Sequence, residues 1–145
     1  MTVIAWDGKT LAADKRSDSG GHINVTTKIS RFGELLVGLT GNLSRACEMR
    51  DWFCAGADPK TYPAPLRDDK DYAAILVIYP GRLIRKYESG GPFPCEFEGD
   101  QFAMGSGRDY ARAALHLGKS AAEAVQVACE FDPGCGNGFD ILDRE

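Results

Sequence analysis

The first forty residues alternate between short apolar segments, rich in β-branched side chains, and short polar segments. This pattern is typical of β-strands joined by tight turns. It predicts strands over residues 2–6, 9–14, 23–31 and 35–41, the last of them largely buried. Gly, Asp and Ser gather between the strands and indicate turns or loops at residues 7–8, 17–22 and 32–34.

After Gly41 the spacing of the apolar residues changes from that of a strand to that of a helix. One helix face is formed by Leu43, Ala46, Cys47, Arg50, Phe53 and Cys54, which recur three or four residues apart. Asn42 stands just before this pattern and is a suitable N-cap. Residues 56–71 are rich in proline and charge, so we expect them to form a connector.

The second half repeats the change from strands to helices. Strands are predicted at residues 72–79, 82–88, 101–105 and 139–143, and helices at 106–118 and 119–131. Pro80-Gly81 indicates a turn, and residues 89–100 are expected to be irregular with a short edge segment. Ser106 is the expected cap of the first of these helices, and Ser120 with Glu123 forms a capping box for the second.

The order is four strands, a helix, three strands, two helices and a strand, which predicts an α+β fold. Short connections favour largely antiparallel sheets. Two sheets packed face to face with helices outside would bury both faces of each sheet. We expect a single domain over residues 1–145, because this length suits one hydrophobic core.

Composition excludes several classes of protein. The formal net charge is −4 and no basic block occurs, which disfavours binding to nucleic acid or to an anionic membrane. No signal peptide or apolar run long enough to span a bilayer is present, so we expect a cytoplasmic protein. The five cysteines show no C-x-x-C spacing, and only His22 and His116 could add nitrogen ligands. We therefore expect buried thiols and no metal or organic cofactor.

The expected hairpins bring together residues that could carry chemistry. If Asp7-Gly8 is a two-residue loop, Thr2 faces Ala13, and a three-residue loop places Thr2 opposite Asp14. By the same rule, a three-residue loop at 32–34 places Lys28 opposite Gly38, and a shorter loop shifts that partner by one residue.

These groups would suit nucleophilic catalysis if Met1 is removed. Thr2 would then carry its own base, since an α-amino group has a reference pKa of about 7.7–8.0. Lys28 would favour the deprotonated hydroxyl, and Asp14 would offset the cost of burying the lysine. The backbone N–H of Gly38 could bind an oxyanion. Each residue also has an ordinary structural explanation, so the hypothesis depends on their combination.

The combination resembles the proteasome β-subunits, and more closely the proteolytic subunits of the bacterial heat-shock-locus V protease. These are N-terminal nucleophile hydrolases with an αββα sandwich. Thr2 with "LAADKR" is similar to the family's first hairpin. This implies that Thr2 is the nucleophile, Asp14 the aspartate beside it and Arg16 the supporting, positively charged residue. "TTKIS" implies that Lys28 is the catalytic lysine. "VGLTGN" implies an oxyanion amide at Gly38, with Leu36 and Thr40 as substrate-pocket candidates.

Two later segments extend the resemblance. "AMGSGRDYARAAL" is similar to the family's G-S-G segment and implies that Ser106 supports the terminal amine. "FDPGCGNGFDIL" resembles the segment that supplies a second support, here Asp132, with Cys135 where a serine is common. The resemblance implies a homo-oligomeric ring, peptide or unfolded-protein substrates, and an ATP-dependent unfoldase as a partner. The short first hairpin, the compact connector and Val3 in place of a second threonine depart from the family.

Three functions stay open at the level of the sequence. The first is a threonine endopeptidase activated by removal of Met1. The second is a catalytically inactive structural or assembly protein with the same fold, which a retained Met1 would favour. The third is an N-terminal nucleophile amidohydrolase that acts on small amides. Activity on peptides, on small amides or on neither distinguishes them.

Overall fold

The computed structural model describes residues 1–63 and 72–144. The chain divides into two compact units. The first unit comprises residues 1–30 and the chain from residue 99 onward, and the second comprises Arg31–Glu98. The chain therefore leaves the first unit once and returns to it once.

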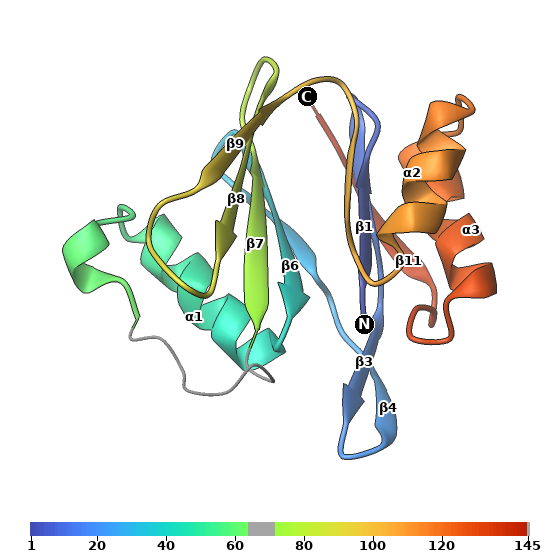
Figure 1. Cartoon of the computed structure of the whole chain (residues 1–145), viewed down its shortest axis with the longest axis horizontal. Helices are drawn as coiled ribbons and strands as arrows, with labels where there is room; N and C mark the ends of the chain where they lie inside the picture. Colours follow the sequence, from blue (N-terminus) through green and yellow to red (C-terminus); the bar gives the residue numbers. More distant parts are fainter. Residues whose placement is uncertain (64–71, 145) are drawn as a thin grey trace. The chain divides into compact units, whose positions relative to one another are not determined.

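The first unit contains a four-stranded sheet with two helices (Figure 1). The strand order is β10-β1-β2-β11, and the three ladders are antiparallel. A separate hairpin is formed by β3 and β4. The elements are β1 (Val3–Trp6), β2 (Thr10–Asp14), β3 (Arg16–Ser19), β4 (His22–Val25), β10 (Phe102–Gly105), α2 (Arg108–His116), α3 (Ala121–Phe131) and β11 (Phe139–Asp143).

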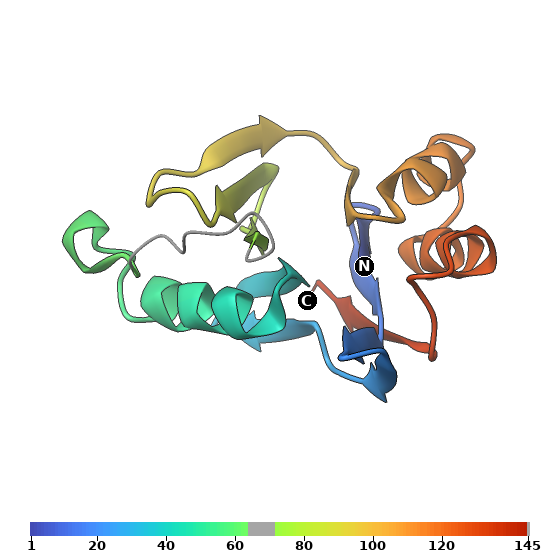
Figure 2. The same cartoon turned by 60° about the horizontal axis from the view of Figure 1, so that its bottom comes forward.

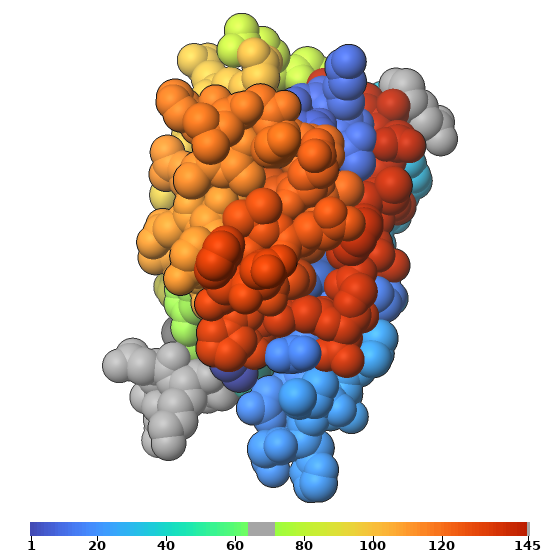
Figure 3. All heavy atoms as spheres, turned by 90° about the vertical axis from the view of Figure 1, so that its right-hand side faces the viewer, coloured from blue at the N-terminus to red at the C-terminus, as the bar shows by residue number. Residues whose placement is uncertain are grey.

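Small side chains let α2 and α3 pack closely on one face of this sheet. The two helices lie side by side in Figure 2 and form the outer surface of the unit in Figure 3. Their buried positions are mostly alanines, which meet Val3 and Ala5 of β1 and Ala12 of β2. Burial of this apolar surface is the main force that holds the helices on the sheet.

The second unit contains the end of β5 and all of β6 to β9, which form a five-stranded sheet in the order β5-β6-β7-β8-β9 with one helix packed on it. Its core contains aromatic side chains, whereas the core of the first unit is made mostly of alanines. Trp52 of the helix contacts Tyr87 edge-on, and Phe53 contacts it at a tilt. The elements are β5 (Ile29–Phe32), β6 (Leu35–Gly41), α1 (Leu43–Cys54), a 3-10 turn (Pro59–Thr61), β7 (Ala73–Ile78), β8 (Leu83–Glu88) and β9 (Cys95–Glu98).

Most predicted elements are confirmed, including the α+β class and the largely antiparallel sheets. Asn42 caps α1 by accepting a hydrogen bond from the Arg45 N–H, and Ser120 with Glu123 forms the capping box of α3. The connector prediction falls partly on residues 64–71, which lie outside the described residues. No helix in the described part of the chain is long and apolar enough to cross a membrane.

The prediction of a loop at 17–22 and one strand over 23–31 was wrong. Residues 17–22 contribute to the hairpin β3–β4, in which Ser19 pairs with His22 across Gly20-Gly21. Both glycines have positive φ, +59° and +83°, as a tight two-residue turn of the primed type requires. The expected single strand is broken at residues 26–28, so Lys28 lies between two strands and belongs to neither ladder.

Two other expectations need correction. Helix α2 begins at Arg108 with Gly107 as its N-cap, and no side chain caps it. Ser106 therefore does not have the capping role expected of it. The turn before β6 comprises only residues 33–34, because Phe32 still belongs to β5. The five cysteines are free thiols, but only Cys135 is buried. Cys95 is exposed and the other three are half-buried, so the expectation of buried thiols was wrong for most of them.

Candidate active site

The β1–β2 hairpin places Asp14 beside the backbone of Thr2 and Val3. Ile4 pairs with Ala13 and Trp6 with Leu11, although β2 itself begins at Thr10. Both expected registers, with Trp6 opposite Lys9 or Thr10, were therefore wrong by one or two residues. Asp7 explains the longer loop, since its Oδ1 accepts hydrogen bonds from the N–H groups of Lys9 and Thr10. Asp14 nevertheless lies within one residue of Thr2 across the ladder, as predicted.

Asp14 is fully buried and its carboxylate is saturated with donors. Oδ1 accepts hydrogen bonds from the Val3 N–H at 3.1 Å and from Lys28 Nζ at 2.8 Å. Oδ2 accepts them from the N–H groups of Arg16 at 3.3 Å and Gly136 at 3.1 Å. A buried carboxylate needs such partners, because an unpaired charge inside a protein is costly. Asp14 therefore joins three segments of the chain at one point.

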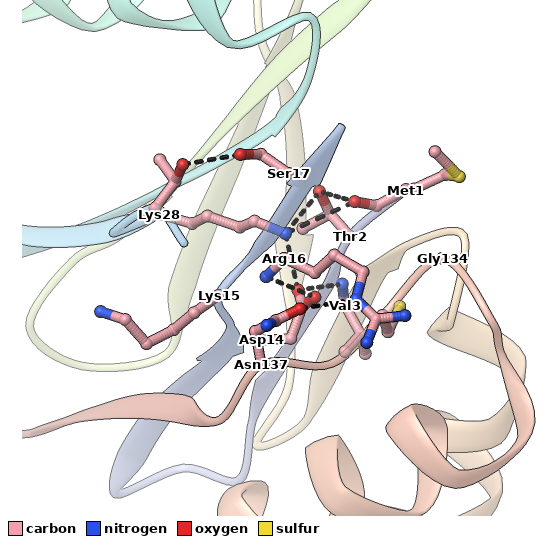
Figure 4. A network of polar contacts seen from close by, with 12 residues as sticks. Met1, Thr2, Val3, Asp14, Lys15, Arg16, Ser17, Lys28, Gly134 and Asn137 are labelled. Atoms are coloured by element: carbon pink, nitrogen blue, oxygen red, sulfur yellow. Dashed lines mark hydrogen bonds and ion pairs between the residues drawn. The ribbon is translucent and has the colours of Figure 1, made fainter. Parts of the chain in front are cut away.

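Lys28 brings its charge to the Thr2 hydroxyl (Figure 4). Its Nζ lies 3.3 Å from Thr2 Oγ1 and 3.4 Å from the carbonyl oxygen of Met1, besides its ion pair with Asp14. The hydroxyl in turn donates to the Met1 carbonyl oxygen at 2.8 Å. Lys28 is 1% exposed and Thr2 is 2% exposed, so this contact is shielded from solvent and weakly screened by salt.

The Thr2 nitrogen is held from the other side. Its N–H donates to Ser106 Oγ at 3.2 Å, and Ser106 Oγ donates to Asp132 Oδ2 at 2.7 Å. The hydrogen bond from Ser106 is the largest cause of a lowered pKa at Asp132, with a further contribution from the Gly134 N–H. Asp132 therefore stays ionised at neutral pH and orients the serine hydroxyl.

Cys135 completes this side of the cluster as a neutral thiol. Its Sγ donates to Asp132 Oδ2 at 3.3 Å. Burial, followed by the charge of Asp14, raises the pKa of Cys135 to about 12, so the thiolate does not form at neutral pH. Cys135 is consequently a weak donor to the aspartate, and its burial and raised pKa do not favour a role as a nucleophile.

Arg16 fastens the loop that carries Asp132 and Cys135. Its Nη1 donates to the Pro133 carbonyl oxygen and its Nε to Asn137 Oδ1, both at 2.7 Å. A side chain at Gly136 would collide with the guanidinium, since an ideal Cβ there lies 2.7 Å from Nη2. Arg16 thus holds this loop by two hydrogen bonds, and its supporting role in the reaction stays a prediction.

Two glycines of the site were not identified from the sequence. Gly105 has a φ of +96°, and a Cβ on it would lie 2.1 Å from the Thr2 carbonyl oxygen. Gly107 donates its N–H to that oxygen at 3.1 Å and packs against Val3, Ala128 and Cys135. The glycines on both sides of Ser106 were the available signal, because they allow the backbone to approach Thr2 closely.

Leu36, Gly38 and Thr40 lie on β6 of the second unit. They alternate with Val37 and Leu39, which pack against α1, so these three residues share the opposite face of the strand. All three are buried, and Gly38 pairs with Leu76 of β7. Their expected roles in binding an oxyanion and a substrate side chain stay predictions.

The cluster of the first unit offers a hydroxyl within hydrogen-bonding distance of a cation and, on the same residue, a nitrogen that donates to Ser106. With Met1 attached, that nitrogen is an amide and has no basic lone pair. Loss of Met1 would turn it into an amine held by Ser106. The described residues contain no group of three or more His, Cys, Asp or Glu that could hold a metal ion.

Comparison with solved structures identifies the fold of this chain. No family model and no curated protein matches the sequence. The BPH protein of Thiobacillus denitrificans, solved in complex with epoxomicin, matches over 100% of both chains with a TM-score of 0.72 and 22% identity. Eukaryotic HslV from Trypanosoma brucei matches over 99% of this chain and 98% of its own, with a TM-score of 0.71 and 17% identity.

A third solved structure is the ancestral β-subunit Anbu from Yersinia bercovieri, with a TM-score of 0.68 and 16% identity over 99% of this chain and 81% of its own. All three are proteasome-type N-terminal nucleophile hydrolases. The chain therefore has the fold of these proteins, and the resemblance inferred from its motifs is confirmed at that level.

Proposed function

We propose that this protein is a threonine endopeptidase of the proteasome type, with Thr2 as the nucleophile once Met1 has been removed. The observation that carries the proposal is the position of Thr2: its hydroxyl lies 3.3 Å from Lys28 Nζ, and its nitrogen lies 3.2 Å from Ser106 Oγ. Both groups of one residue are thus held by partners that suit a nucleophile and a base.

The reaction begins with proton transfer within Thr2. The free amine takes the hydroxyl proton, directly or through a water molecule, and Oγ1 attacks the peptide carbonyl carbon. The Lys28 ammonium stabilises negative charge on Oγ1, while Asp14 keeps that ammonium in place. The protonated Thr2 amine then gives its proton to the leaving amine, which leaves an ester between Thr2 and the acyl part of the substrate. Water hydrolyses this ester and restores the enzyme.

Other residues have supporting roles in the proposal. Ser106 and Asp132 orient the Thr2 amine, with Cys135 and Arg16 fixing the loop on which Asp132 lies. The Gly38 N–H binds the oxyanion, and Leu36 and Thr40 shape the pocket for the residue before the cleaved bond. These last three assignments rest on the resemblance of "VGLTGN" to the family.

The cellular setting is also part of the proposal. By the same resemblance, the protein forms a homo-oligomeric ring in the cytoplasm and receives unfolded substrates from an ATP-dependent unfoldase. The five free cysteines are compatible with a reducing compartment.

The test combines the identity of the first residue with activity. Mass spectrometry of the native protein is expected to show Thr2 as the mature N-terminus, and this species is expected to hydrolyse unstructured peptides. Thr2→Ala should abolish hydrolysis and Thr2→Ser should retain part of it. Because a relative was solved in complex with epoxomicin, this compound is a suitable inhibitor to include.

The outcome also separates the competing functions. Full activity in Thr2→Ala would contradict the proposal. A protein that retains Met1, assembles and hydrolyses nothing would be the structural protein with this fold. Hydrolysis of small amides without any cleavage of peptides would identify the amidohydrolase.

A further inference from the structure

The side chain of Met1 occupies a definite position over Gly134. Met1 is itself 61% exposed, whereas Gly134 is buried. An ideal Cβ at Gly134 would lie 2.8 Å from Met1 Cβ, 2.8 Å from Met1 Cγ and 2.9 Å from Met1 Sδ. These are the three nearest atoms to that Cβ position, so the missing side chain of Gly134 leaves the space that Met1 fills. We call this space the Met1 seat.

The Met1 seat lies next to the atoms that would react. The Thr2 nitrogen has three neighbours: its own Cα, the carbonyl carbon of Met1, and Ser106 Oγ, to which its N–H donates at 3.2 Å. The carbonyl oxygen of Met1 lies 2.8 Å from Thr2 Oγ1 (Figure 4). Removal of Met1 therefore opens the seat on the side of the nitrogen that Ser106 does not occupy.

The leaving half of a substrate must pass through this space. In the proposed reaction, the Thr2 amine protonates the leaving amine, and this requires hydrogen-bonding distance between the two nitrogens. The position that Met1 vacates satisfies this requirement. The Cα and side chain of the first residue after the cleaved bond would then lie close to where the Cα and side chain of Met1 lie now.

We propose that the seat over Gly134, opened by removal of Met1, binds the side chain of the substrate residue that follows the cleaved bond, and that Gly134 sets the size it accepts. The inference rests on the proposed function and adds a binding site on the leaving side of the reaction. The occupant in the structure indicates its chemistry: an unbranched apolar side chain of about the length of methionine fits, and glycine fits without filling it.

Gly134 is well suited to a test by substitution. Its φ does not lie in the left-handed region, so an L-residue is not strained there. Its interaction with Asp132 uses the backbone N–H, at 2.8 Å, and any residue except proline keeps that bond. A side chain at this position would therefore act mainly on whatever occupies the Met1 seat.

The experiment uses the processed full-length protein and two peptides that are identical except for the residue after the cleaved bond, methionine in one and glycine in the other. Gly134→Leu is expected to lower the ratio of kcat/KM for the methionine peptide to that for the glycine peptide by about tenfold or more, since overlap with a filled pocket costs at least as much as a lost methylene. Gly134→Ala is expected to give a smaller change in the same direction.

Gly90→Leu serves as the matched control. Gly90 has no atom within 4 Å of an ideal Cβ and no positive φ, so this variant is expected to keep the wild-type ratio. Equal melting temperatures for the alanine variant and the wild type show that the fold is kept.

The inference is overturned if the ratio is unchanged in both Gly134 variants, or if both peptides lose activity to the same extent. A processed wild-type protein that cleaves neither peptide would instead contradict the proposed function, and the subsite would fall with it. An active enzyme whose preference after the cleaved bond does not respond to Gly134 contradicts the subsite alone.

Discussion

Asp14 connects the reactive residues to the backbone around them. Its two oxygens accept hydrogen bonds from three backbone N–H groups and from Lys28. Among the described residues, Asp14 is the only charged group in contact with the Lys28 ammonium, whose other contacts are the Thr2 hydroxyl and the Met1 carbonyl oxygen. The two partners of this buried ion pair should therefore respond unequally to substitution.

We expect Lys28→Met to destabilise the protein by about 3–5 kcal/mol, because it leaves a buried carboxylate without its cation. Asp14→Ala should cost more, because it also leaves three N–H groups without an acceptor, at about 1–3 kcal/mol for each buried group. Urea denaturation of both variants measures this order. An Asp14→Ala variant that is more stable than Lys28→Met would contradict this reading of the network.

The lowered pKa of Asp132, caused first by the Ser106 hydrogen bond, predicts a dependence of stability on pH. A carboxyl with a lower pKa in the folded protein stabilises the fold above its unfolded pKa, about 3.9, and loses this contribution as pH falls through its folded pKa. The stability of the wild type relative to Asp132→Asn should therefore be constant near neutral pH and decline below about pH 4. Denaturation midpoints between pH 2.5 and 7 test this, and a difference independent of pH would contradict it.

The sequence allowed the charged and hydroxyl residues of the site to be predicted better than its glycines. Thr2, Asp14 and Lys28 were expected together, and the structure brings them together. Gly105 and Gly134 were missed because the reason for each glycine is a close approach of residues distant in the chain, to Thr2 and Met1 respectively. The glycines on both sides of Ser106 marked the first of these approaches, whereas no local pattern marked the second.

Among the elements, the β1–β2 loop has a function that its sequence only partly revealed. Asp7 closes the loop with Oδ1 and, through Oδ2, accepts a hydrogen bond from the Ala121 N–H at 2.8 Å. Ala121 is the first residue of α3, where free N–H groups and the helix dipole favour a negative charge. One side chain thereby fixes the hairpin that carries Thr2 and Asp14 against the helix.

Asp7→Ala should therefore destabilise the protein by about 1–2 kcal/mol, since the variant loses acceptors both for the loop and for the helix start. Asp51→Ala is the control, because the Asp51 side chain is 75% exposed and, among the described residues, forms an ion pair only with the neighbouring Arg50. Its cost should be below about 0.5 kcal/mol. Thermal or urea unfolding measures both variants, and equal losses would show that the bridge to α3 contributes nothing.

The hairpin β3–β4 shows where prediction of elements from local composition fails. Ser, Asp and Gly are typical of loops, so residues 17–22 were interpreted as a loop. Two consecutive glycines are also typical of a primed hairpin turn, which is what they form here. β3 is polar and was missed, whereas β4 alternates Ile23 and Val25 with polar residues and fell partly within the strand expected at 23–31. Every residue of β4 is exposed, so no buried face marked where the strand begins and ends. By contrast β6 and β7, which have buried apolar runs, were predicted with nearly correct ends.

At the scale of the whole molecule, the chain forms two compact units, and the first is made of two separate segments of sequence. Strand β5 begins in one unit and ends in the other. Unfolding of either unit would thus release part of a shared strand. We predict that the protein unfolds as the single domain expected from its length, in one cooperative transition.

Two probes of denaturation test this prediction: Trp52 fluorescence in a Trp6→Phe variant, which then reports on the second unit, and hydrogen exchange at Ala124 and Val125 in the core of the first. Two-state unfolding gives coincident transitions for the two probes. Two separate midpoints would show that the units are independent domains.

The central claim is that Thr2 becomes the nucleophile when its nitrogen is freed from Met1. Its most direct test is mass spectrometry of the processed protein, quenched in acid during turnover of a peptide, followed by mapping of its N-terminal fragment. Thr2 is expected to carry the added mass of the acyl part of the substrate, and no such adduct is expected in protein that retains Met1 or carries Thr2→Ala. An acyl group on any other residue, or turnover by the Thr2→Ala variant, would contradict it.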